Sequence, residues 1–107
     1  MRKRNGQEIH VPADSTITLN GTTYYTNGGV TLFLGRSEAS LHGYRMEYKR
    51  RTGWDIPRIR DGKKKYMSED NLFRFILALE DILPFQAEKV RTIIKEREEK
   101  EERVTAQ

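Results

Sequence analysis

The chain has 107 residues, of which 36% are hydrophobic and 34% are charged, enough for one small core under a highly charged surface. It has no cysteine, which excludes disulfide frameworks, thiolate metal sites and cysteine nucleophiles. It also has no apolar run near the ~20 residues that cross a bilayer. The basic start at residues 2–4 is not followed by the apolar core of a signal peptide. We therefore expect a cytoplasmic protein.

The positive charge is concentrated in the middle of the chain. Residues 37–67 carry nine lysines and arginines against four acidic residues, a net charge of +5, whereas residues 1–36 carry +2 and residues 68–107 carry −3. A face that binds phosphate groups needs such a concentration of positive charge. A solvated surface that is basic for no functional reason has the same composition, so charge alone leaves both interpretations open.

Two elements precede the basic segment. Residues 1–14 are expected to form a flexible basic arm, which either lies along a DNA groove or stays free, and His10 within it has no second metal ligand nearby. Between Thr16 and Thr26, β-branched and apolar residues alternate around an Asn-Gly dipeptide, which accepts positive φ at both central turn positions. This pattern predicts a β-hairpin.

Residues 27–34 fit two different structures. One is a helix that is capped by Thr26 or Asn27 and ends at Gly35. The other is a hairpin turn at the Asn-Gly-Gly sequence followed by a third strand. Two glycines in the first helical turn cost up to roughly 1 kcal/mol each relative to alanine. We favour the helix because of the helix that follows, and its buried positions would be Val30, Phe33 and Leu34.

A second helix is predicted at residues 37–51. Ser37 is a suitable N-cap, Glu38 lies favourably at the positive end of the helix, and Gly53 closes it. The spacing i, i+3 and i+7 puts three side chains on one face, which we expect to be buried: Leu41, Tyr44 and Tyr48. The other face then presents Ala39, His42, Met46, Lys49 and Arg50, with Arg45 at the boundary.

A second hairpin, strongly basic, is predicted at residues 56–66 around an Asp-Gly turn. Ile59 and Tyr66 are expected to face inward, and Trp54 in the preceding loop is expected to cover the edge of the core. Five cations flank the turn: Arg58, Arg60, Lys63, Lys64 and Lys65. These cations give the hairpin a strong positive electrostatic field. A hairpin that lies beside a phosphate backbone needs such a field, and a hairpin with no such partner does not.

The C-terminal part is predicted to be helical. Ser68 caps a third helix with a broad apolar face, and Pro84 suits the first position of another helix. A short apolar stripe there (Val90, Ile93 and Ile94) gives way to residues 96–103, which are all charged. The stripe either docks on the domain or pairs with a second copy, and the last turns are expected to fray. The apolar face of the third helix contains Leu72, Phe73, Ile76, Leu77, Leu79, Ile82 and Leu83.

A helix–turn–helix followed by a basic hairpin is the layout of a winged-helix module that docks on duplex DNA. We therefore expect an α+β fold: a small winged helix-turn-helix domain with an N-terminal β-hairpin at residues 15–83, between the arm and a charged C-terminal helix at residues 84–107.

Over residues 24–83 the chain resembles the DNA-binding domain shared by MerR-type regulators and phage or plasmid excisionases. The matching positions of the two helices are Tyr25, Thr26, Gly28, Val30, Gly35, Ser37, Leu41 and Tyr44. Those of the hairpin and the next helix start are Arg60, Asp61, Gly62, Lys63, Tyr66, Ser68, Asp70 and Leu72.

The resemblance implies a winged helix without a cofactor. Asn27, Gly29 and Thr31 depart from the family pattern in the first helix, and Glu38 stands where a basic contact residue is common, which suggests a different base preference. No effector-binding domain follows the winged helix, so we expect no small-molecule effector. An excisionase-like architectural factor or a small phage or plasmid transcriptional regulator fits better.

The predicted function is non-enzymatic binding of double-stranded DNA, which implies a nucleoid-associated location. The helix at residues 37–51 would enter the major groove and the hairpin at residues 56–66 would lie on the backbone and minor groove. A homodimer or a cooperative array through residues 84–103 would lengthen the site. The expected DNA-binding residues are Ser37, Glu38, Ser40, His42, Arg45, Lys49, Arg50, Arg58, Arg60, Lys63, Lys64 and Lys65.

Two other classes of function were weighed. An enzyme is disfavoured because Asp55, Asp61 and His42 form no evident acid–base pair or metal cluster. A protein–protein adaptor, such as a phage DNA-packaging subunit that assembles through its C-terminal helix, is the rival hypothesis. RNA binding is disfavoured because the aromatic residues are expected to be committed to the core.

Overall fold

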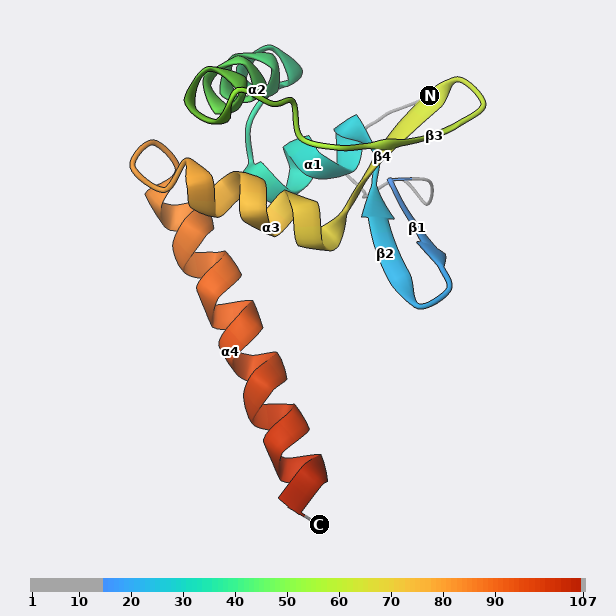
Figure 1. Cartoon of the computed structure of the whole chain (residues 1–107), viewed down its shortest axis with the longest axis vertical. Coiled ribbons are helices and arrows are strands. Elements are labelled where there is room, and N and C mark those ends of the chain that lie inside the picture. Colours follow the sequence, from blue (N-terminus) through green and yellow to red (C-terminus); the bar gives the residue numbers. More distant parts are fainter. Residues whose placement is uncertain (1–14, 107) are drawn as a thin grey trace, which may run out of the picture.

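Four strands and four helices make up the residues that the computed structural model describes, 15–106 (Figure 1). The arm at residues 1–14, with His10, lies outside them. The elements in chain order are β1 (Thr16–Leu19), β2 (Thr22–Tyr25), α1 (Asn27–Leu34), α2 (Glu38–Thr52), β3 (Ile59–Asp61), β4 (Lys64–Ser68), α3 (Glu69–Ala78) and α4 (Pro84–Ala106). The expected α+β class is confirmed.

The strands form one antiparallel sheet in the order β1-β2-β4-β3. The predicted hairpin β1–β2 is confirmed, and Asn20 (φ 53°) and Gly21 (φ 81°) both have positive φ at its turn. The inner strands β2 and β4 pair over a short stretch, with Tyr24 opposite Ser68 and Tyr25 opposite Met67. The sheet therefore consists of two hairpins joined through their inner strands.

The basic hairpin β3–β4 is also present, but its turn is shifted by one residue from the prediction. Asp61 still pairs with Lys64, so the central turn residues are Gly62 (φ 66°) and Lys63. Positive φ at the first central position alone is the pattern of a type II′ turn, which tolerates a non-glycine residue second. Of the residues expected to face inward, Tyr66 is buried but Ile59 is 40% exposed.

Residues 27–34 are helical, so the alternative of a third strand was wrong. The Thr26 hydroxyl accepts a hydrogen bond from Gly29 N at 3.1 Å, and Gly35 ends the helix in the left-handed conformation. Gly29 is needed here, because a Cβ on it would stand 2.3 Å from the backbone oxygen of Ser15. The same oxygen accepts a hydrogen bond from Thr26 N at 3.0 Å. The helix start is thus held against the residue that precedes β1.

The second helix, α2, has the predicted buried face, and it ends at Thr52, one residue beyond the predicted end. The Ser37 side chain caps it, Gly53 (φ 81°) ends it, Leu41 is buried, and Tyr44 and Tyr48 pack against the core. The loop that follows differs from the prediction. Trp54 is 76% exposed instead of covering the core, because Gly53 turns the chain outward and the buried Ile56 fills that position.

The core lies between α1, α2, β4, α3 and the first turns of α4. The Ser68 cap of α3 is confirmed, and most of its predicted apolar face is buried, although Ile82 is 40% exposed in the turn that follows α3. The apolar stripe of α4 docks on the domain, since Val90 belongs to the core. The core side chains are Val30, Leu34, Leu41, Ile56, Met67, Leu72, Phe73, Phe75, Ile76, Leu79, Leu83, Ala87 and Val90.

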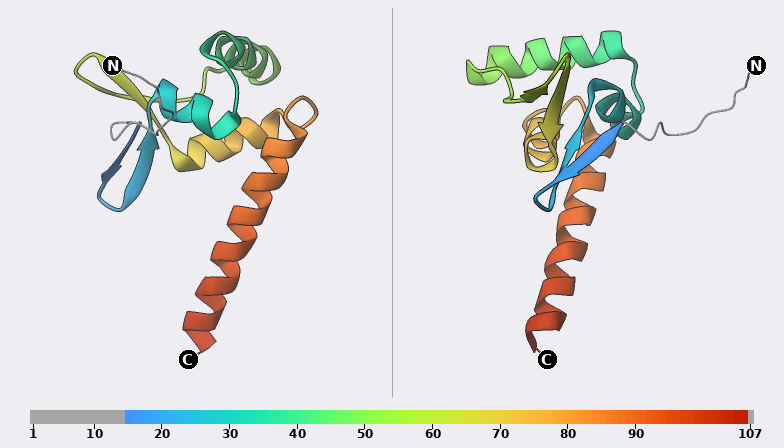
Figure 2. Two further views of the ribbon diagram at one scale, coloured as in Figure 1. Left: turned by 180° about the vertical axis from the view of Figure 1, so that it is seen from behind. Right: turned by 90° about the vertical axis from the view of Figure 1, so that its right-hand side faces the viewer.

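Helix α4 begins at Pro84, as predicted, and extends away from the rest of the chain (Figures 1 and 2). Its start is anchored where Gln86 Nε2 donates to the Leu34 backbone oxygen at 2.7 Å. The molecule is 51 Å long. Helix α2 and the β3–β4 hairpin lie at one end of it, and the C-terminal end of α4 lies at the other (Figures 1 and 2). No helix within residues 15–106 is long and apolar enough to cross a membrane.

Candidate nucleic-acid interface

An open hollow of about 560 Å³ lies between the start of α1, the middle of α2 and the tip of the β3–β4 hairpin. We call it the basic hollow, because five of its nine lining residues are cationic. Its lining residues are Ser15, Thr26, Asn27, Gly28, Arg45, Arg58, Lys63, Lys64 and Lys65. Cationic side chains from α2 and from the β3–β4 hairpin region thus meet beside the start of α1, although these segments are far apart in the sequence.

The start of α1 adds partial positive charge to the basic hollow. The first backbone N–H groups of a helix have no partner within the helix, and the aligned peptide dipoles place about half a positive charge at that end. Thr26 satisfies the N–H of Gly29, while Asn27 and Gly28 line the hollow. Backbone donors and cationic side chains together form an environment that suits an anion.

Two arginines form the inner wall of the basic hollow. The Arg45 side chain is only 19% exposed, and its Nη2 donates to Asp55 Oδ2 at 3.1 Å. Its Nε is buried without a hydrogen-bond partner within residues 15–106. Burial, followed by the charge of Arg45, lowers the pKa of Arg58, and Asp55 partly offsets this. An anion in the hollow would relieve the repulsion between the two guanidinium groups.

The outer wall comes from the hairpin tip, where Lys63, Lys64 and Lys65 are all exposed. Arg60 is exposed on β3 directly opposite Lys65, so it extends the positive surface along the hairpin beyond the hollow. Cations on both strands of so short a hairpin repel one another in the absence of a counter-charge.

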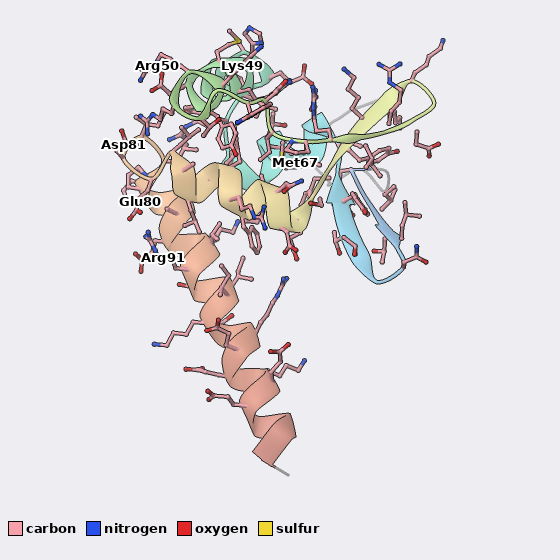
Figure 3. All side chains as sticks on the ribbon, in the orientation of Figure 1. Lys49, Arg50, Met67, Glu80, Asp81 and Arg91 are labelled. Atoms are coloured by element: carbon pink, nitrogen blue, oxygen red, sulfur yellow. The ribbon has the colours of Figure 1, made fainter. Side chains whose placement is uncertain are left out.

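One side of α2 continues this surface. Glu38, His42, Arg45 and Lys49 follow one another at i, i+4, i+7 and i+11, which puts them on one face of the helix, and Arg45 leads from it into the basic hollow. We call these four residues the α2 stripe. Three of its members are exposed, and Lys49 lies on the outer side of the molecule (Figure 3).

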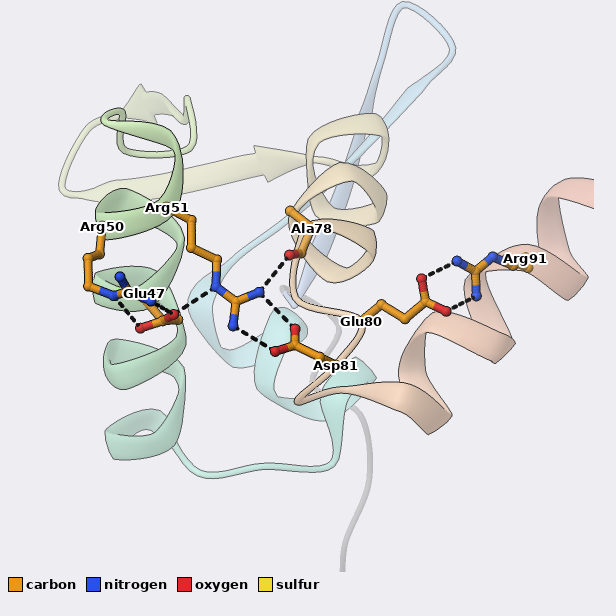
Figure 4. Close-up of polar contacts among 7 residues, drawn as sticks. All are labelled: Glu47, Arg50, Arg51, Ala78, Glu80, Asp81 and Arg91. Carbon is orange, nitrogen blue, oxygen red and sulfur yellow. Dashed lines mark hydrogen bonds and ion pairs between the residues drawn. The ribbon is translucent and has the colours of Figure 1, made fainter.

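The other predicted contact residues on α2 are engaged elsewhere. Ser37 and Ser40 form the helix cap, with Ser37 Oγ accepting from Ser40 N at 3.1 Å. Arg50 Nε donates to Glu47 Oε1 at 3.0 Å, and the same carboxylate accepts from Arg51 (Figure 4). Of the twelve predicted site residues, the structure brings five together around the basic hollow: Arg45, Arg58, Lys63, Lys64 and Lys65. The other members of the α2 stripe share a helix face with Arg45, Arg60 lies opposite Lys65 on the hairpin, and Ser37, Ser40 and Arg50 lie on other faces of α2.

The prediction from sequence missed four lining residues: Ser15, which precedes β1, and Thr26, Asn27 and Gly28 at the start of α1. Thr26 or Asn27 was identified as the helix cap, but a capping signal fixes only where the helix begins and not which residues face that end. A helix start facing a basic hairpin is visible only once the sheet order is known.

Within the described part of the chain, no group of three or more His, Asp or Glu side chains is arranged to hold a metal ion. Five of the nine residues that line the basic hollow are cationic donors, so its chemistry suits an anion. A comparison of the chain with protein-family models, curated proteins and solved structures gives no match.

Proposed function

We propose that the protein binds double-stranded DNA without catalysing a reaction, and that the basic hollow holds the phosphate backbone. The observation that carries this proposal is the meeting of five cationic side chains and a helix start in one hollow beside an exposed helix. Phosphate oxygens accept hydrogen bonds from arginine, lysine and backbone N–H groups at helix starts, and all three kinds of donor are present.

Helix α2 is the element that would enter the major groove. It has 15 residues, a length of about 22 Å, and its stripe is polar and largely exposed. The major groove of DNA is about 12 Å wide and admits an α-helix. Glu38 and His42 would face base edges, and Glu38 is suited to accept a hydrogen bond from the amino group of cytosine. Lys49 would contact a phosphate.

In this proposal the β3–β4 hairpin acts as the wing of a winged helix-turn-helix domain. Its tip residues Lys63 and Lys65 would contact the backbone beside the groove that α2 occupies. The sequence resemblance to MerR-type and excisionase domains supports this assignment, as does the order helix, turn, helix, hairpin. An excisionase-like factor or a small transcriptional regulator in the nucleoid remains the role that we propose.

The proposal is tested by fluorescence anisotropy on labelled duplexes at low salt. Replacing Lys63 and Lys65 together with alanine should weaken binding to every sequence, because phosphate contacts are independent of sequence. Arg74→Ala is the matched control, since Arg74 is exposed on α3 and does not line the hollow. Equal affinities of the double variant and the control would contradict the proposal.

A second candidate function is assembly with other protein chains through α4. The helix has 23 residues, and those beyond Ile94 are exposed as far as residue 102. In this part Arg97 pairs with Glu69, with 2.6 Å between Nη1 and Oε1, and lies over the Phe73 ring at 5.8 Å from its centroid. The helix as a whole extends away from the domain (Figure 1). A dimer, an array on repeated DNA sites and a packaging-type adaptor would all use it.

Sedimentation of the full chain and of a chain that ends at residue 97 tests this second function. If α4 drives assembly, the full chain should sediment as a concentration-dependent oligomer and the shortened chain as a monomer. Identical monomeric behaviour of both at high concentration would remove self-assembly through α4.

A further inference from the structure

Trp54, the single tryptophan of the chain, is 76% exposed at the end of α2. Hydrogen bonds hold the backbone at Trp54 in place. Trp54 N donates to Thr52 Oγ1 at 3.1 Å, and that hydroxyl lies within donating distance of the Tyr48 oxygen, at 2.9 Å. Gly53 N donates to the Lys49 oxygen at 2.7 Å and ends the helix. The chain at Trp54 is thus held to the last turn of α2.

The residues after Trp54 are fixed as well. The Asp55 carboxylate accepts a hydrogen bond from Arg45 at 3.1 Å, and the Ile56 side chain is only 3% exposed. Because Ile56 occupies the core position, the indole has no place in the core and is presented to solvent. Trp54 is thus a large, exposed aromatic residue between the end of α2 and the buried Ile56. Exposed aromatic residues of this kind are common at binding interfaces.

The charges around Trp54 indicate what it would contact. Lys49 precedes it on α2 and Arg58 follows it in the loop before β3, whereas Arg50 is paired with Glu47. The nearest acid in the sequence, Asp55, is paired with Arg45. A partner that suits this setting is a polyanion that also offers apolar surface. Nucleic acid meets both requirements, since its sugars lie between its phosphates.

Phe85 is a useful contrast, because it is even more exposed, at 82%. It follows the turn that carries Glu80 and Asp81 and is the second residue of α4. Glu80 and Asp81 are paired with Arg91 and Arg51, as Asp55 is with Arg45, so local charge does not separate the two aromatic residues. Phe85 differs in its place, because it stands at the start of α4, whereas Trp54 follows α2, the helix that the proposed function places on DNA. That place distinguishes Trp54.

We propose that Trp54 is a DNA-contacting residue, whose indole packs against the sugars of the strand that Lys49 and Arg58 hold through its phosphates. This inference rests on the proposed function and adds an apolar contact to it. Sugars are the same at every base pair, so Trp54 would contribute affinity without sequence preference. The exposure of Trp54 and Phe85 shows that the expectation that the aromatic residues are committed to the core was wrong for these two.

The single tryptophan permits a direct test on the full chain. Binding to a labelled duplex of random sequence is followed by anisotropy at low salt, and the accessibility of Trp54 is followed by acrylamide quenching of its emission. Polyglutamate serves as the second probe, because it supplies negative charge without sugars. Trp54→Ala and Trp54→Phe are compared with Phe85→Ala, and urea unfolding verifies that each variant is folded.

The inference predicts that the duplex shields Trp54 from acrylamide and that polyglutamate does not. Trp54→Ala should bind the duplex on the order of tenfold more weakly, as expected for a central aromatic contact, while Trp54→Phe loses less. Phe85→Ala should bind like the unaltered chain.

Salt-sensitive binding with no shielding and no loss in Trp54→Ala would overturn the inference and leave the proposed function standing. Equal shielding by polyglutamate would also overturn it. A failure of the unaltered chain to bind any duplex would instead overturn the proposed function.

Discussion

Gly28 and Gly29 stand side by side in the first turn of α1, and their surroundings differ. A Cβ on Gly28 would meet only the Thr26 hydroxyl, at 3.7 Å, whereas a Cβ on Gly29 would lie 2.3 Å from the backbone oxygen of Ser15. Backbone cannot move aside as a flexible side chain does. The cost of glycine in a helix, which weakened the prediction of α1, is thus offset at Gly29 by a close approach that only glycine permits.

We predict that Gly29→Ala destabilises the protein by about 1–3 kcal/mol, the usual cost of overpacking. Gly28→Ala is the matched control and should be neutral or raise the free energy of unfolding by up to about 1 kcal/mol, since alanine favours the helix. Urea unfolding of both variants measures the difference. Equal stability of the two would show that the start of α1 is not held against Ser15.

At the scale of elements, Arg51 fastens α2 to the turn between α3 and α4 (Figure 4). Its two terminal nitrogens donate to the two Asp81 carboxylate oxygens at 2.7 and 2.8 Å, and one of them also donates to the Ala78 oxygen at 3.2 Å. Its Nε donates to Glu47 at 2.7 Å. The planar guanidinium makes all these bonds at once, which an ammonium group cannot do.

Arg51→Lys should therefore lower the melting temperature, because a lysine ammonium group cannot bond to Glu47 and to both Asp81 oxygens at once. Arg50→Lys is the control, since Arg50 donates to Glu47 on its own helix. Thermal unfolding followed by circular dichroism distinguishes the two variants. If Arg50→Lys lowered the melting temperature as much as Arg51→Lys, the link between α2 and the α3–α4 turn would contribute nothing to stability.

The same link gives an expected pH dependence. Hydrogen bonds from Arg50 and Arg51 lower the pKa of Glu47 from its ordinary 4.5 to about 2. The folded state therefore favours the ionised carboxylate, whose stabilising effect is complete above pH 4.5 and is lost as the pH falls towards 2. Glu47→Gln should be less stable than the unaltered chain at pH 7, and the difference should shrink at pH 3. Urea unfolding at the two pH values measures it, and a constant difference would contradict the assignment.

For the molecule as a whole, signals within short stretches of sequence predicted most of the elements. Thr26, Ser37 and Ser68 cap helices because their hydroxyls reach backbone N–H groups three residues on, and the Asn-Gly turn needs only its own two residues. The basic hollow could not be predicted in this way, because it depends on how the hairpins and helices meet. Which cations are paired with acids outside their own helix, as Arg51 is with Asp81 and Arg45 is with Asp55, also depends on the tertiary structure.

Charge is separated along the length of the molecule. The α2 stripe, the basic hollow and the β3–β4 hairpin lie at one end, and the acid-rich end of α4 lies at the other (Figures 1 and 2). A polyanion is therefore attracted to the end with the basic hollow and repelled from the end of α4. This arrangement would orient DNA against α2 before any specific contact forms.

The most direct test of the central claim is the salt dependence of binding to a random-sequence duplex between about 50 and 200 mM salt. If the five cations of the basic hollow each neutralise a phosphate, the logarithm of the affinity should fall against the logarithm of salt with a slope near −4 to −5. The Lys63 and Lys65 double variant should show a slope less steep by about 2. Absence of binding at low salt, or binding that salt does not weaken, would contradict the account.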